Sequence, residues 1–447
     1  MAINIDKFEL PITAQETRDY LQRNTDNFGV FFDVDRIYEL SALLQLEMLD
    51  VTRKARRLSL NPKLMLDDKN GVINTLLKMG VSKAEFYVNE GGKKSREMKY
   101  TADIRKSIAE SGMYSPEVVE FVKINDIYVS NKRNKGYIEN LANRQPQSRA
   151  LSKLNHRMAV GRPTWSILNT SRIAADNPGV QGVPRTMGDI ICEPKGYTLV
   201  RCDSGQIEPR INFSTFLRDE LIMNLIIYYD DAYFGLLNYC NMHNDEEQLC
   251  RADFQSNFKP MEITDSIKDM RQNIKRLTNA GSYGSANLGN INPQLAQLYE
   301  MKIVKHPARK ALEASVREAV NHGEDTFYGF FGTPVTPQET EKYKKGEDGW
   351  NEHVIRCGIN NPIQTTASEL MMFSVNKARE ILSRAKDSHV CFYKHDEACF
   401  YVSDEDMANG IGDELADITA YNVKGWIPIH ADPMFGIKPG EYPSYIL

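Results

Sequence analysis

Two β-prone runs near the C-terminus constrain the fold of this chain most, because only four residues separate them. The runs are residues 390–393 (Val-Cys-Phe-Tyr) and residues 398–402 (Ala-Cys-Phe-Tyr-Val). So short a connection leaves room only for a tight turn, which predicts an antiparallel hairpin. The connecting residues are Lys-His-Asp-Glu, so the hairpin carries Asp396 and Glu397 at its tip.

A second strand is predicted from Tyr197, where Tyr-Thr-Leu-Val-Arg-Cys leads into the turn formers Asp203-Ser-Gly. Taken alone, a strand-end aspartate is an ordinary turn residue or helix cap. Two carboxylates on different strands can instead hold two divalent cations about 3.5–4 Å apart, the arrangement used in phosphoryl transfer. Asp203 and Asp396 are therefore candidate ligands of a metal pair.

A helix predicted over residues 264–284 carries a stripe of functional side chains. Arg271, Lys275, Asn279 and Tyr283 recur every four residues, so they share one helix face. Arginine as a fork and lysine as a point charge can grip a triphosphate. The competing interpretation is a solvated helix face with one packed tyrosine.

Composition indicates the size of the core, the cellular compartment and the charge of the surface. The chain has 447 residues, of which 41% are hydrophobic, enough for a large core with several subdomains. Seven scattered cysteines indicate a reducing cytoplasm, and no apolar run is long enough for a membrane helix. The net charge of −5 argues against a global positive field but allows a local basic cleft.

Further helices are predicted over residues 34–57 (capped by Asp35), 67–78, 116–131 and 366–385, with an exposed loop over 341–350.

Four motifs in this order resemble the family A, polymerase-I-like DNA polymerases. The eight residues from Asp203 (Asp-Ser-Gly-Gln-Ile-Glu-Pro-Arg) resemble the first palm motif, and the helix from Arg271 resembles the nucleotide-binding fingers helix. Asn360-Asn-Pro-Ile-Gln-Thr-Thr-Ala, preceded by Arg356, resembles a third motif, and His395-Asp-Glu the second palm motif. Each motif alone is weak, but the ordered set is strong.

Weaker matches extend the resemblance from about residue 28 to the C-terminus. Thr170-Ser-Arg, the Asn-Pro-Gly-Val-Gln segment that ends at Gln181, and the Gly-Val-Phe-Phe-Asp segment that ends at Asp33 have counterparts in the family. The resemblance implies an α+β right-hand polymerase fold, with an antiparallel palm sheet and helical thumb and fingers. The implied boundaries are an N-terminal extension over residues 1–27, a thumb over 28–150, palm over 151–228 and 335–447, and fingers over 229–334.

The resemblance also implies roles for individual residues in template-directed DNA synthesis with two magnesium ions, for which manganese can substitute. The metals would be held by Asp203, Asp396 and the Ser204 carbonyl, with Glu397 beside them. Lys275 would also donate a proton to the leaving group. The implied nucleotide-binding residues are Arg271, Lys275, Asn279, Tyr283, Gln206 and Glu208, and the implied DNA-binding residues are Arg172, Gln181, Arg356, Asn360, Gln364 and His395.

Glu208 matches the family's steric gate against a ribose 2′-hydroxyl, which favours deoxynucleotides; without the motif it would be a surface acid. Asn279 departs from the usual Phe or Tyr, which puts sugar selection in doubt. Cys240, His243 and Cys250 leave a zinc site open, although an ordinary loop insertion fits their irregular spacing better.

The expected activity has two alternatives. One is a single-subunit RNA polymerase relative, against which Glu208 argues, and the other a catalytically weak or inactive DNA-binding replication subunit, against which the intact acids and cations argue. The resemblance implies primer–template DNA and dNTPs as partners, and no membrane. With only about 27 residues ahead of the thumb-like region, no attached 3′-to-5′ exonuclease is expected. We also expect a separate exonuclease or processivity factor as a possible partner. The expected origin is a phage, and the expected location is the cytoplasm of its bacterial host.

Overall fold

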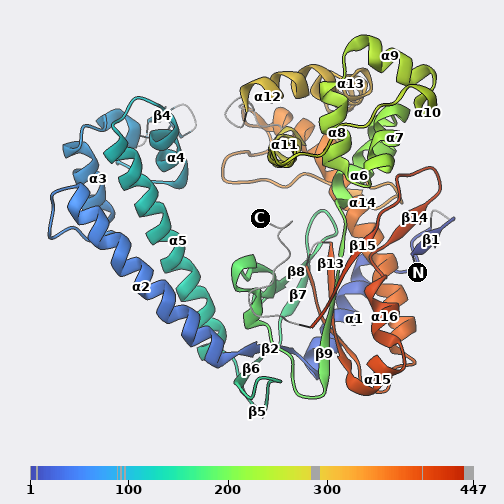
Figure 1. Ribbon diagram of the computed structural model, residues 1–447, viewed down its shortest axis with the longest axis horizontal. Helices are drawn as coiled ribbons and strands as arrows, with labels where there is room; N and C mark the ends of the chain where they lie inside the picture. Colours follow the sequence, from blue (N-terminus) through green and yellow to red (C-terminus); the bar gives the residue numbers. More distant parts are fainter. Residues whose placement is uncertain are drawn as a thin grey trace. The chain divides into compact units, whose positions relative to one another are not determined.

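Four antiparallel strands form the central sheet of the computed structural model, in the order β12-β13-β9-β15 (Figure 1). The structure describes residues 2–6, 9–87, 89–90, 93–94, 97–282, 292–394 and 396–436. The predicted hairpin is confirmed as the pair β12–β13, and the predicted strand from Tyr197 as β9. The strands of the sheet are β9 (Tyr197–Ser204), β12 (His389–Lys394), β13 (Glu397–Ser403) and β15 (Ala431–Phe435).

The sheet belongs to the first of two compact units, which holds the described residues of 1–29, 162–181 and 196–436. Residues 398–402 on β13 are fully buried, which explains why this strand reads as a continuous apolar run. Other small strands of the first unit pair β1 with β14 in parallel, and β7 with β8 and β10 with β11 antiparallel. They are β1 (Ile3–Ile5), β14 (Tyr421–Val423), β7 (Thr164–Ile167), β8 (Ile173–Asp176), β10 (Phe327–Tyr328) and β11 (Pro334–Val335).

Several helices pack on this sheet. One of them, α1, lies within residues 1–27, the segment expected as an N-terminal extension, so this segment is part of the first unit. Helix α1 contacts β7 and β12, and α16 contacts β9, β13 and β15. Helix α14 begins well before the predicted residue 366 and contains Pro362 in its interior. These helices are α1 (Ala14–Asn27), α6 (Ile207–Ile211), α14 (Trp350–Leu382), α15 (Asp404–Ala408) and α16 (Ile411–Ala416).

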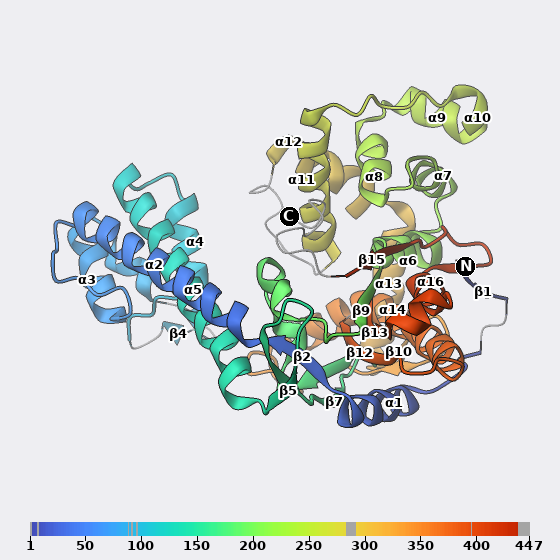
Figure 2. The ribbon, with the colours of Figure 1, turned by 60° about the horizontal axis from the view of Figure 1, so that its bottom comes forward.

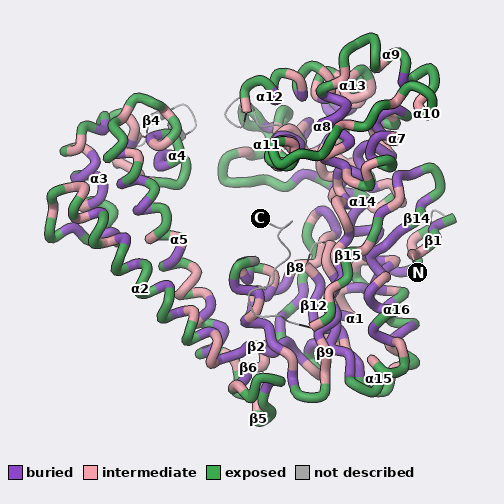
Figure 3. The backbone as a smooth tube through the Cα atoms, viewed as in Figure 1, coloured by how far each residue is buried: buried purple, intermediate pink, exposed green. Residues whose placement is uncertain are grey.

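A second helical group in the first unit shares one hydrophobic cluster, to which α7, α8, α11 and α12 contribute buried side chains. Figure 2 shows α8 beside α11, and Figure 3 shows the inward faces of these helices buried. Helix α11 confirms the predicted helix that carries Arg271 and Lys275. The group consists of α7 (Glu220–Tyr229), α8 (Ala232–Asn241), α9 (Asn244–Ala252), α10 (Phe254–Asn257), α11 (Asp265–Ser282), α12 (Pro293–Tyr299) and α13 (Pro307–Asn321).

The second unit holds the described residues of 30–161 and 182–195 and is built on two long helices, α2 and α5, that pack against each other. The predicted helix over 34–57 is confirmed, but its N-cap is Asp33, whose side chain accepts the Arg36 amide hydrogen bond. The predicted cap Asp35 instead pairs with Arg157. The helices are α2 (Val34–Leu58), α3 (Lys69–Lys78), α4 (Ala102–Glu110) and α5 (Pro116–Arg144).

Five short strands complete the described part of the second unit. Three of them form an antiparallel sheet in the order β2-β6-β5, and β3 pairs with β4. They are β2 (Val30–Asp33), β3 (Asn89–Glu90), β4 (Lys93–Lys94), β5 (Gln147–Leu151) and β6 (Arg157–Gly161). Across the described helices of both units, none has the length and apolar composition needed to cross a bilayer.

Candidate functional site

The register of the central sheet brings the two candidate metal-binding acids together. Asp203 at the end of β9 lies opposite Glu397 at the start of β13, and Asp396 occupies the turn immediately before Glu397. The Ser204 amide donates a hydrogen bond to the Asp396 carbonyl, with 3.0 Å between nitrogen and oxygen. Residues far apart in the sequence therefore become neighbours at one end of the sheet.

A third acid, which the sequence analysis did not identify, joins this row. Asp432 on β15 lies opposite Asp203 on the side away from Glu397. Directly opposed residues on adjacent strands share a sheet face, so Glu397, Asp203 and Asp432 form a row of carboxylates. Burial raises the pKa of Asp432, and the nearby Asp230 carboxylate adds to the rise while Arg210 opposes it.

Glu397 is already compensated by a cation. Arg201, two residues before Asp203 on β9, donates from Nε to Glu397 Oε1 at 2.6 Å, and both side chains are largely buried. Sequence motifs did not point to Arg201. The pair fixes the orientation of Glu397 beside the acidic end of the sheet.

The surroundings of Asp396 strongly perturb the pKa of its carboxyl group. Burial raises its pKa to about 6, and the like charges of Glu208 and Glu397 add to the rise, whereas Arg172 opposes it. A half-buried carboxylate held among other acids favours a bound cation, and carboxylate and carbonyl oxygens are the ligands that Mg²⁺ prefers. The donor set of Asp203, Asp396 and the Ser204 carbonyl fits magnesium, although no three His, Cys, Asp or Glu side chains of the described chain already stand in metal-ligating geometry.

The cationic stripe of α11 lies in the same unit, and its arginine has an acidic partner. Arg271 donates from Nε to Asp231 Oδ2 at 3.0 Å, and the Gln206 side-chain amide donates to the same oxygen at 2.7 Å. The guanidinium of Arg271 and the ammonium of Lys275 also lie over the ring of Tyr233, at 5.2 and 5.9 Å from its centroid. Asp231 and Tyr233 were not identified from the sequence.

Arg172 connects the predicted gate residue to the predicted DNA-binding residues. It forms an ion pair with Glu208, and its Nη1 donates to Gln364 Oε1 at 3.3 Å. Because Arg172 and Glu208 both act on the pKa of Asp396, these side chains lie near the acidic end of the sheet. The structure thus brings Arg172, Glu208, Gln364 and Asp396 together.

A small pocket of about 20 Å³ collects four of the predicted site residues from three helices: Glu208 of α6, Asn279 of α11, and Asn360 and Gln364 of α14. Pro209, Asn212, Thr278 and Ile363 complete its lining. The side-chain oxygen of Asn360 is buried and accepts no hydrogen bond. An unsatisfied acceptor in a pocket is suited to a ligand that donates a hydrogen bond.

The remaining predicted residues have other surroundings. The Gln181 side-chain amide donates to the backbone carbonyls of Ile173 and Tyr393, at 2.8 and 2.7 Å, and so ties β8 to β12. Arg356 lies over the ring of Tyr343, 5.2 Å from its centroid. Tyr283 and His395 lie outside the described residues.

The structure gives no support to a zinc site formed by Cys240, His243 and Cys250. Cys240 and Cys250 are buried in the hydrophobic cluster of the helical group, whereas His243 is exposed at the start of α9. Burial raises the pKa of the Cys240 thiol to about 12 and also raises that of Cys250, which opposes the thiolate form that zinc needs. Ordinary packing accounts for both cysteines.

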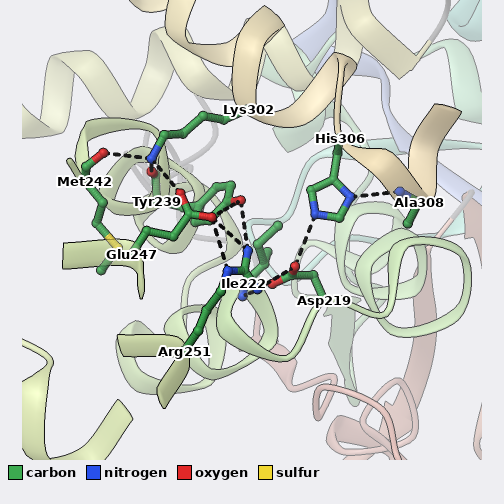
Figure 4. Close-up of polar contacts among 9 residues, drawn as sticks. All are labelled: Asp219, Ile222, Tyr239, Met242, Glu247, Arg251, Lys302, His306 and Ala308. Carbon is green, nitrogen blue, oxygen red and sulfur yellow. Dashed lines mark hydrogen bonds and ion pairs between the residues drawn. The ribbon is translucent and has the colours of Figure 1, made fainter. Parts of the chain in front are cut away.

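A network of half-buried charges, joined through the exposed Arg251, links elements of the helical group (Figure 4). Asp219, the N-cap of α7, accepts hydrogen bonds from His306 Nε2 at 3.1 Å, from Arg251 at 2.9 Å and from the Ile222 amide at 3.0 Å. Arg251 also pairs with Glu247 of α9, which accepts a further hydrogen bond from Lys302. The network links α7, α9 and the start of α13.

We expect Asp219→Asn to lower the free energy of unfolding by about 2 kcal/mol at neutral pH, although asparagine can still cap α7. Burial alone would raise the pKa of Asp219, but the hydrogen bonds from His306, Ile222 and Arg251 lower it to about 2. Because this pKa lies below the unfolded value, the stabilisation is present above pH 4 and is lost as the pH falls toward 2. Denaturant unfolding of both proteins from pH 7 to pH 2 measures the difference.

The control for this prediction is Asp265→Asn, which removes a carboxylate at an exposed position of α11. It should leave the unfolding curve unchanged across the pH range. A stability difference between wild type and Asp219→Asn that does not shrink on acidification would show that the charge of Asp219 is not what the network needs.

Comparison with known proteins supports the fold. No family model and no curated protein matches the sequence. A solved structure, the POL domain of Pol1 from M. smegmatis in complex with DNA primer-template and dNTP, matches with a TM-score of 0.69 and 16% sequence identity. The match covers 96% of this chain and 69% of that chain. The chain therefore has the α+β right-hand polymerase fold that the sequence predicted.

Proposed function

We propose that this protein is a DNA-directed DNA polymerase, a nucleotidyltransferase of the family A type that extends a primer 5′ to 3′ with dNTPs. The observation that carries the proposal is the convergence of Asp203 and Asp396 at one end of a palm-like sheet. Its support is the fold, shared with a polymerase domain that was solved with primer-template and dNTP.

In this proposal, Asp203, Asp396 and the Ser204 carbonyl would hold two magnesium ions. The ions would acidify the primer 3′-hydroxyl for attack on the α-phosphorus and neutralise the departing pyrophosphate. Asp432 and Glu397 lie beside the proposed ligands at the same end of the sheet, and because Arg201 offsets the charge of Glu397, Asp432 is the acid that adds negative charge there. Their proximity strengthens the attraction for divalent cations.

The side chains of α11 would bind the incoming nucleotide. Arg271 would grip the triphosphate as a fork, and Lys275 would hold it as a point charge and protonate the leaving pyrophosphate from Nζ. Gln206, Asn279 and the predicted Tyr283 would contact the same nucleotide. Because Arg271 is paired with Asp231, the triphosphate would compete with that carboxylate for the guanidinium.

The remaining side chains would position primer and template. Arg172 and Gln364, which are hydrogen-bonded to each other, would contact the DNA near the primer terminus. The proposed duplex contacts also include Gln181, Arg356, Asn360 and His395. We place the reaction in a cytoplasm, with primer–template DNA and dNTPs as the partners.

Primer extension tests the proposal directly. The purified chain, magnesium and four dNTPs should lengthen a labelled primer on a template strand, and nucleotide order should follow the template. Extension with NTPs in preference to dNTPs would favour an RNA polymerase instead. DNA binding without any extension would favour an inactive replication subunit.

We expect Glu208→Ala to raise the use of ribonucleotides relative to deoxynucleotides by about 10- to 100-fold, as expected when a pocket loses a group that excludes a hydroxyl. Glu208 lines the pocket with Asn279, and its removal would open the space that a 2′-hydroxyl needs. Single-nucleotide insertion kinetics with dATP and ATP measure the ratio. Glu208→Gln keeps the size of the side chain and should retain most of the discrimination; an unchanged ratio in Glu208→Ala would contradict the gate.

A further inference from the structure

A larger pocket, of about 420 Å³, lies within the second unit, outside the proposed active site. Helix α5 forms one wall with a stripe at i, i+3, i+4, i+7 and i+8, which begins at Asn125 and ends at Arg133. The opposite wall comes from the loop that precedes α3 and from the first turns of that helix. The volume is in the range of small-molecule sites.

The floor of this pocket is apolar and aromatic. Leu66 and Val72 are 4% and 1% exposed and belong to the hydrophobic cluster of the second unit. Tyr100 and Tyr128 line the pocket and pack against the same cluster. Flat rings over an aliphatic floor are suited to a planar ligand.

Two buried polar atoms of residues that line the pocket have no hydrogen-bond partner. Asn125 is 1% exposed, and its side-chain nitrogen donates to the Leu66 carbonyl at 3.4 Å, which identifies its other atom as the oxygen. That oxygen accepts no hydrogen bond, and the Tyr100 hydroxyl likewise has none. Burial of unsatisfied groups is costly, so a ligand with a hydrogen-bond donor would relieve the cost.

Cations surround the mouth of the pocket. Lys69, Lys132 and Arg133 are exposed lining residues, and Arg105 contributes a buried guanidinium, held by Asp126 and 5.4 Å from the Tyr100 ring centroid. Among the described residues of the lining, Asp67 has the one carboxylate, 3.5 Å from the Lys132 ammonium. The lining is therefore net positive and suited to an anionic group.

We propose that this pocket binds a nucleotide unit, with the base on the aromatic floor, an amino group of the base donating to Asn125 Oδ1, and the phosphate among the cations of the mouth. A hydrocarbon ligand would leave Asn125 unsatisfied. Inorganic phosphate would engage the mouth alone. The unit can come from a free nucleoside monophosphate or from a nucleotide of single-stranded DNA, and the two sources share this chemistry.

Calorimetric titration of the full chain tests the proposal, with deoxyadenosine monophosphate and, separately, a short single-stranded oligodeoxyadenylate as probes. We expect Asn125→Leu and Arg133→Gln each to weaken binding of the probe about tenfold, the effect of one lost hydrogen bond or charge contact. Lys123→Gln is the matched control: Lys123 is an exposed lysine of α5 that does not line the pocket. It should bind both probes like the wild type.

The design separates this pocket from the proposed active site. The double variant Arg271→Ala/Lys275→Ala should keep the binding that Asn125→Leu loses. Loss of monophosphate binding in Asn125→Leu supports a free nucleotide, and loss confined to the oligonucleotide supports a DNA strand. Binding that Asn125→Leu and Arg133→Gln leave unchanged, or no binding of either probe, would overturn the inference. Melting temperatures of all variants identify any that fail to fold.

Discussion

Asp396→Asn is expected to abolish primer extension, with a loss in kcat of at least about a thousandfold, while the protein stays folded. Asparagine has nearly the same shape but lacks the negative charge that would hold magnesium beside Asp203. Burial and the neighbouring acids raise the pKa of Asp396, so its charged form costs folding free energy at neutral pH. The variant should therefore be more stable than the wild type by about 1–2 kcal/mol, after allowance for its partial exposure.

Single-turnover primer extension and denaturant unfolding, measured on the same preparations, check both parts. Asp404→Asn is a suitable control, because Asp404 follows the opposite end of β13 and is exposed at the start of α15. It should extend primers at the wild-type rate. Wild-type extension by Asp396→Asn would eliminate the proposed metal site.

Arg271→Ala and Lys275→Ala are expected to impair nucleotide use in different ways. Arg271→Ala would remove the proposed contact with the triphosphate, so KM for dNTPs should rise about 10- to 100-fold. Loss of Lys275 also removes the proposed proton donor, so kcat should fall by about 10²- to 10⁴-fold. Steady-state kinetics with a saturating primer–template separate the two effects.

Lys268→Ala provides the reference for these variants. Lys268 lies on the same helix, is well exposed and pairs with Asp265. Its removal should leave both constants unchanged. Equal kinetics of Lys268→Ala and Arg271→Ala would mean that Arg271 serves only its contacts with Asp231 and Tyr233 and does not bind the nucleotide.

Local patterns in the sequence predicted the elements that depend on local physics. The hairpin β12–β13 follows from two apolar runs and a short connection, and α2 and α11 follow from helical spacing. Helix α14 begins at Trp350, earlier than the predicted residue 366, although Pro362 and the Asn-Asn pair before it disfavour a helix interior. In the structure, α14 continues through these residues because tertiary packing buries the helix on several sides.

Long-range partners were less predictable. Asp432 lies on a five-residue strand that contains Pro433, and nothing in that segment indicates pairing with β9. Arg201 and Asp231 compensate Glu397 and Arg271, yet each looks like an ordinary charged residue in the sequence. The alternation of β9 could have drawn attention to Arg201, because it shares a sheet face with Asp203.

The contact between Arg271 and Asp231 has a further consequence for selectivity. The carboxylate of Asp231 pairs with the Arg271 guanidinium, which therefore has a counter-charge before any nucleotide is bound. In the proposed function, the incoming triphosphate would compete with this tethered carboxylate, and the competition would favour molecules with several negative charges over those with one. The Asp231 carboxylate would thereby exclude weakly charged metabolites from Arg271 before any bond to the primer is formed.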